Sequence, residues 1–181
     1  MFIRKNILFF LLLLLAFVKL KLYFQHTDND GLYFMLMPTN ALVSLITGSH
    51  AIYSNEAGFQ HEQLAIVIEK SCAGFNLFLI FLMVLSYLAI KYFQTAGDKI
   101  KHILLATLTA WIITILVNAS RIWTSIIVQS VTKKNWPQSQ QLIHECIGIF
   151  INLSALLMVY FFLDRYLSGK MAEGAKQSDL K

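Results

Sequence analysis

The sequence predicts an all-α polytopic membrane protein with about four transmembrane helices, an interfacial or re-entrant helix and a small extracytoplasmic β-hairpin. Of its 181 residues, 57% are hydrophobic and 14% are charged, whereas soluble domains average about 45–50% apolar and about 25% charged residues. Long apolar runs recur along the chain with basic residues at their ends, as membrane topology predicts. These observations exclude a disordered chain, a disulfide scaffold and a typical cytosolic enzyme.

The net charge of +5 indicates contact with the lipid bilayer and not with nucleic acid. A basic excess can serve either partner, but the basic residues do not gather into one patch with interleaved aromatic residues. Crossing a bilayer takes about 20 apolar residues. The chain forms one predicted integral membrane domain, residues 1–166, with spans at about 6–24, 76–94, 102–120 and 143–166.

The first span is predicted to be an uncleaved anchor. It follows Arg4 and Lys5, as the apolar region of a signal peptide follows a basic one. No small-residue cleavage site comes after it, and Lys19 also argues against cleavage.

Residues 32–48 are apolar but too short for a span, and Pro38 interrupts them. We expect an interfacial or re-entrant helix at the outer face, with Pro38 marking a helix start inside the segment. The alternative is that this segment does span the membrane, in which case everything after it has the opposite orientation.

Residues 50–69 read as a strand, a turn and a strand, with a β-branched cluster at 66–68. Because a sheet edge cannot sit in lipid, this hairpin is predicted to lie outside the bilayer.

The distribution of basic residues along the chain favours an orientation with both termini on the inner side of the membrane. The polar tail, residues 167–181, is predicted to be a disordered cytoplasmic segment.

This topology brings three reactive side chains to the outer membrane boundary from three distant segments. Cys72 lies just before the second span, Arg121 just after the third and His144 at the start of the fourth. A thiol, a guanidinium and an imidazole at one depth form a candidate catalytic set.

Cys72 is predicted to be the first residue of a helix with Ser71 as its N-cap, a position that stabilises a thiolate. Gly74 leaves room for a substrate backbone or a neighbouring helix, and Asn76 is expected on the same helical face. Two other interpretations stay open: a buried structural cysteine, or a disulfide with Cys146.

Arg121 shares a helical face with Asn118 and could hold an oxyanion or a carboxylate. The other interpretation of Arg121 is a side chain that extends to the membrane interface. His144 starts a stripe that continues through Gly148, and a histidine there can move protons near neutral pH. The other interpretation of His144 is an interfacial histidine that caps a span. Glu145 is a weak candidate for orienting the His144 ring.

No metal or other cofactor is predicted. The remaining histidines lack ligand spacing, and a zinc site from His50, His61 and His144 has only a weak signal.

Three short blocks in this order resemble the signature blocks of the exosortase/archaeosortase family, and most closely those of the exosortase K group. They are Ser71–Asn76, Asn118–Ile122 and His144–Gly148. The likeness extends over about residues 30–165. Many family members are longer, with more spans, and have serine where this chain has Ala73.

The resemblance implies a cysteine peptidase or transpeptidase of the bacterial inner membrane whose site faces the periplasm. Cys72 would be the nucleophile, His144 the acid and base, and Arg121 the stabiliser of the transition state. The expected partners are exported proteins with a C-terminal sorting signal, made of a recognition motif, a transmembrane helix and a basic tail.

A second class stays open from the residues alone. A non-catalytic accessory subunit or small transporter would use Arg121 and His144 to bind an anionic ligand or a partner helix. The sequence also does not separate hydrolysis from transfer to an acceptor.

Overall fold

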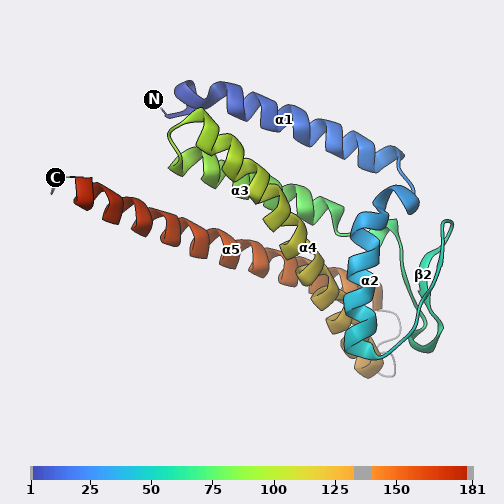
Figure 1. Ribbon diagram of the computed structural model, residues 1–181. Coiled ribbons are helices and arrows are strands. Elements are labelled where there is room, and N and C mark those ends of the chain that lie inside the picture. The colour runs from blue at the N-terminus through green and yellow to red at the C-terminus, as the bar shows by residue number, and fades with distance from the viewer. Residues whose placement is uncertain (1, 133–139, 179–181) are drawn as a thin grey trace.

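The computed structural model describes residues 2–132 and 140–178 (Figure 1). Five α-helices make up most of this part of the chain, and a three-stranded antiparallel sheet lies at one end of them. The helices are α1 (Phe2–His26), α2 (Tyr33–Thr47), α3 (Phe75–Tyr92), α4 (Ala96–Thr132) and α5 (Gln140–Ser178). The predicted fold class is therefore confirmed.

Four of the helices are long and apolar enough to cross a membrane. Their apolar segments are Lys5–His26, Lys70–Tyr92, Ala96–Val131 and Leu142–Met171. The α3 segment is 67% buried inside the protein, whereas those of α1 and α5 are each 6% buried. The second of these four helices therefore differs from the others: α3 is the central helix, and α1 and α5 leave most of their apolar surface for lipid.

Both termini lie at one end of the helices, together with the turn between α3 and α4, and the sheet lies at the other end (Figure 1). At the terminal end, the Lys91 ammonium forms an ion pair of 2.7 Å with Asp164, which joins α3 to α5. The buried Lys99 ammonium donates a hydrogen bond of 2.7 Å to Asn6, which joins α4 to α1. These contacts fasten together the end of the molecule opposite the sheet.

The helix α2 covers most of the predicted segment 32–48. Its 15 residues extend about 22 Å at about 1.5 Å per residue, less than the bilayer core of about 30 Å. The expected helix start at Pro38 is wrong, since α2 begins at Tyr33 and Pro38 lies inside it. Proline cannot donate to the carbonyl four residues earlier, and the Trp111 indole of α4 donates to that Phe34 carbonyl instead, at 3.3 Å.

Two helices are longer than predicted. The segment after Arg121, expected to be a loop, continues α4 to Thr132. Its hydroxyl groups bond back to the helix, as Thr124 does to the Ser120 carbonyl at 2.8 Å, so these residues cost the helix little. The tail predicted to be disordered continues α5 to Ser178, because it holds several strong helix formers and no proline. Residues 179–181 lie outside the described part.

The sheet has three strands and not the two of a hairpin. They are β1 (Ile52–Ser54), β2 (Gly58–His61) and β3 (Ile66–Ile68), in the order β1-β2-β3. The additional strand is β2, which lies between the two predicted strands and of which only Gly58 was expected in the turn. Its Phe59 is buried in the core, and the burial of this aromatic side chain favours a strand at this position.

The sheet is joined to the end of α2 through the buried side chain of His61. Its Nδ1 lies 2.7 Å from the Ser49 hydroxyl, and its Nε2 lies 2.7 Å from Oδ1 of Asn40 in α2. The β3 strand then leads through a short 3₁₀ helix, Lys70–Cys72, into α3. The sheet therefore positions the turn that carries Cys72.

Candidate active site

Cys72 and His144 border the same cavity, although they are separated by two transmembrane helices in the sequence. The cavity has a volume of about 350 Å³ and lies between β3, the Cys72 turn, the C-terminal half of α4 and the start of α5. Its lining residues are Ile66, Val67, Ile68, Cys72, Ile122, Ser125, Ile126, Gln129 and His144. A residue with a thiol and a residue with an imidazole thus line one mostly apolar cavity.

Arg121 of α4 packs against α5 one turn beyond His144 and is not among the described residues that line this cavity. A Cβ atom built on Gly148, one turn beyond His144 in α5, would lie 3.4 Å from Cδ of Arg121. The absence of a side chain at Gly148 therefore lets the Arg121 side chain pack directly against α5.

Cys72 is the last residue of the 3₁₀ helix and not the first residue of α3. Its N–H donates to the Glu69 carbonyl at 2.8 Å, and the Ser71 hydroxyl lies 3.7 Å from its sulfur. The expected N-cap at Ser71 is wrong, because Gly74 is the N-cap of α3, with φ of +70°. This left-handed conformation favours glycine, and it separates the Cys72 turn from the helix.

Asn118 holds the Cys72 turn in place from α4. Its Nδ2 donates a hydrogen bond of 2.5 Å to the Cys72 carbonyl oxygen. A Cβ on Gly74 would lie only 3.0 Å from Cγ of Asn118. Gly74 and Asn118 therefore meet in close contact, and both support the position of the thiol.

Asn76 does not belong to the cavity. It is exposed at the N-terminal end of α3, and its Oδ1 accepts a hydrogen bond of 2.6 Å from the Lys21 ammonium of α1. The expected helical face shared by Asn76 and Cys72 does not form, because the left-handed residue Gly74 interrupts the helix between them.

Five buried polar atoms around the site have no hydrogen-bond partner among the described residues. They belong to residues of α4 and α5: Asn118 Oδ1, Arg121 Nε, Ser125 Oγ, His144 Nδ1 and Asn152 Oδ1. Buried polar groups are rarely unpaired, since each carries a desolvation cost of about 1–3 kcal/mol. A polar ligand bound here would supply hydrogen-bond partners for these atoms. Glu145 is exposed and does not orient His144 through Nδ1.

Ser125 was missed from the sequence. It lies four residues after Arg121 and seven after Asn118, so the three side chains follow one face of α4. That polar stripe on an otherwise apolar helix was the signal that could have found it.

Both cysteines are free, Cys72 half-buried and Cys146 exposed, so the alternative of a disulfide between them is wrong. The weak zinc alternative is also not formed. No group of three or more metal-ligating side chains occurs among residues 2–132 and 140–178, and His61 is engaged by Ser49 and Asn40.

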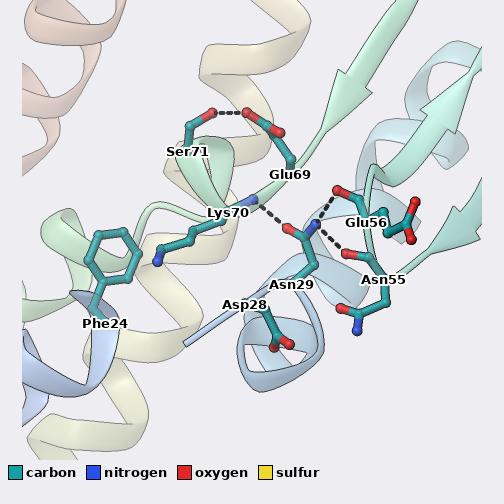
Figure 2. A pocket seen from close by; sticks show the side chains of 8 residues that line it. All are labelled: Phe24, Asp28, Asn29, Asn55, Glu56, Glu69, Lys70 and Ser71. Atoms are coloured by element: carbon teal, nitrogen blue, oxygen red, sulfur yellow. Dashed lines mark hydrogen bonds between the residues drawn. The ribbon is translucent and has the colours of Figure 1, made fainter. Parts of the chain in front are cut away.

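The Cys72 turn is anchored on its other side by Asn29, which follows α1 (Figure 2). The Asn29 Oδ1 accepts from the Lys70 N–H at 2.7 Å, and its Nδ2 donates to the Asn55 carbonyl at 2.7 Å. The Lys70 ammonium donates to the Thr27 carbonyl at 2.7 Å. Its charge is therefore directed at the end of α1 and not at Cys72.

A second cavity, of about 560 Å³, lies beyond this anchor (Figure 2). Ser71 borders this cavity, whereas Cys72 borders the one described above. The short 3₁₀ helix therefore separates the two cavities, and only the 350 Å³ cavity has both the thiol and the imidazole among its described lining residues.

Comparison with known protein families, with curated proteins and with solved structures finds no match to this chain. Its function must therefore be inferred from the residues and geometry of the site.

Proposed function

We propose that this protein is a membrane cysteine peptidase or transpeptidase of the exosortase type. In this proposal it cleaves a C-terminal sorting signal of exported proteins at the outer face of the bacterial inner membrane. The observation that carries the proposal is the single cavity bordered by both Cys72 and His144. Arg121, packed against Gly148 one turn further along α5, adds the third predicted side chain.

In the proposed reaction, the Cys72 thiolate attacks the scissile carbonyl carbon, and the carbonyl oxygen takes the electron pair. Arg121 stabilises this oxyanion. The carbon–nitrogen bond then breaks, and His144 donates a proton to the leaving amine, so a thioester remains on Cys72. Water or an acceptor amine opens the thioester while His144 takes a proton, and the thiolate is released.

The apolar lining of the cavity supports this chemistry. Most of its lining residues are apolar, and apolar surroundings strengthen the interaction of Arg121 with a developing negative charge. The unpartnered polar atoms of Arg121 and Asn118 supply donors and acceptors that no described residue uses.

The two free cysteines allow a direct test by alkylation with iodoacetamide in detergent solution. Exposure alone predicts that the exposed Cys146 reacts faster than the half-buried Cys72. An activated nucleophile predicts the reverse order at pH 7, because the thiolate is the reactive form. Mass spectrometry of each cysteine peptide measures both rates in one sample.

His144→Gln should slow the alkylation of Cys72 and leave that of Cys146 unchanged. The matched control is His102→Gln, since His102 stacks on Phe93 near the turn between α3 and α4. Faster reaction of Cys146 in the native protein would support the alternative of a non-catalytic accessory subunit or transporter and would contradict the proposed peptidase.

A further inference from the structure

The β3 strand has a free edge whose polar backbone groups are not used within the sheet. A Cβ built on Gly58 of β2 would lie 2.5 Å from the Ile68 carbonyl oxygen, so this carbonyl faces β2. Backbone polar groups of successive residues point to opposite sides of a strand. Val67 therefore directs its N–H and C=O away from β2, and neither group has a partner among the described residues.

This free edge runs along the cavity that contains Cys72. All three residues of β3 border the cavity, and side chains of successive strand residues point to opposite faces. A cavity that touches all three therefore follows the edge of the strand. Because β3 leads into the Cys72 turn, Val67 and Cys72 border one continuous space.

The far wall of the cavity defines what kind of side chain fits. Ile122 and Ile126 of α4 are apolar, whereas Ser125 between them is 4% exposed and its hydroxyl has no partner. A charged group would be unpaired against this wall, which is costly. A short, uncharged side chain with one hydrogen-bonding group would satisfy the Ser125 hydroxyl.

We propose that the substrate's recognition segment binds as a fourth strand on the edge of β3, paired with the Val67 main chain, with a short hydrogen-bonding side chain directed at Ser125. This inference rests on the proposed function and names the substrate subsite of the same centre. Main-chain pairing of this kind supplies affinity, and pockets for alternate side chains supply selectivity.

The test uses peptide chloromethyl ketones that alkylate Cys72, with iodoacetamide as the reagent that needs no peptide binding. The probe is acetyl-Val-Thr-Ala chloromethyl ketone, compared with analogues that carry a methyl group on one amide nitrogen at a time. Only alternate amides of a paired strand face its partner. One methylation should therefore reduce the labelling rate at least tenfold, and methylation of the neighbouring amide should change it less than twofold.

Two variants of the protein extend this test. Val67→Pro removes the outward N–H and should reduce labelling by the peptide probe at least tenfold, whereas the control Val67→Ala keeps that N–H and should behave as the native protein. Ser125→Ala should reduce the preference for threonine over valine at the middle position of the probe by about tenfold. All variants should keep the native rate with iodoacetamide, which shows that the thiol itself is intact.

The outcomes separate this inference from the proposed function. Equal labelling by all methylated probes, with rapid iodoacetamide labelling of Cys72, overturns strand pairing and leaves the peptidase proposal standing. A Cys72 that iodoacetamide labels no faster than Cys146 overturns the proposed function itself. The methylated probes act on the native chain, so a Val67→Pro variant that fails to fold does not prevent the decision.

Discussion

The side-chain amide of Asn118, near the middle of α4, donates a hydrogen bond of 2.5 Å to the main-chain carbonyl of Cys72. The two residues are 46 positions apart, and this bond joins the turn that carries the thiol to the helix that carries Arg121. Asn118 is 1% exposed, so the bond is shielded from water. Asn118 is therefore a positioning residue for the thiol.

Asn118→Ala should lower the stability of the protein by about 1 kcal/mol, because it removes a buried hydrogen bond. It should also slow labelling of Cys72 by the peptide chloromethyl ketone, since the turn is no longer held against α4. Thermal unfolding in detergent and the labelling rate measure the two effects. Asn76→Ala, at the exposed end of α3, is the control and should leave labelling unchanged. An Asn118→Ala variant with native labelling would show that the bond does not position the thiol.

Gly74→Ala should be more harmful than a glycine substitution at an unconstrained position. The new Cβ would lie 3.0 Å from Asn118 Cγ, and the φ of +70° adds a conformational cost of about 1–2 kcal/mol. The control is Gly97→Ala in the first turn of α4, where a Cβ meets no atom within 4 Å. It should be neutral or slightly stabilising.

The double variant Gly74→Ala with Asn118→Ala tests whether these two residues act on each other. Removing the Asn118 side chain makes room for the new Cβ, so the double variant should lose less stability than the sum of the single losses. Additive losses of the unfolding free energy would mean that the contact between Gly74 and Asn118 is not under strain in Gly74→Ala.

Arg121→Lys should affect the two labelling reagents differently. Attack on the chloromethyl ketone carbonyl creates an oxyanion, which the planar guanidinium can stabilise with two donors and an ammonium cannot in the same way. The rate with the peptide probe should therefore fall about tenfold or more, whereas the iodoacetamide rate should change little. Equal decreases with both reagents would indicate that Arg121 acts on the thiol and not on the oxyanion.

His61 should make stability depend on pH between about pH 7 and pH 5. Burial lowers the pKa of His61 below its ordinary value of 6.5, so the unfolded chain takes up this proton more readily than the folded one. The stability from neutral His61 is present above pH 6.5 and is lost as the pH falls through the lowered pKa of the folded state.

Thermal unfolding at pH 7 and pH 5 measures this effect. The unfolding midpoint of the native protein should fall over this interval, and that of His61→Gln should fall less. The control is His50→Gln, because His50 is exposed, and it should retain the native pH dependence. Identical pH dependence in His61→Gln and in the native protein would contradict the role given to His61.

The parts of the fold that follow from local chemistry could be predicted. Lipid requires long apolar segments and leaves no place for an open sheet edge, so the number of long helices and the presence of a separate small sheet were readable from residues 1–166. Helix ends were less readable. The serine and threonine hydroxyls of α4 resemble loop residues in sequence, but bonds such as that of Thr124 to the Ser120 carbonyl make them compatible with a helix.

The sequence by itself determined which chemistry the chain carries: apolar spans, a thiol before one span, a guanidinium after another and an imidazole at the start of a third. Only the tertiary structure decided that Asn118 binds the Cys72 turn, that Asn76 faces α1 and that Ser125 borders the cavity with Val67. The physical reason is that these contacts depend on the left-handed conformation of Gly74 and on helices packed at close range. Neither the conformation of Gly74 nor the packing between helices can be read from the spacing of residues along one segment.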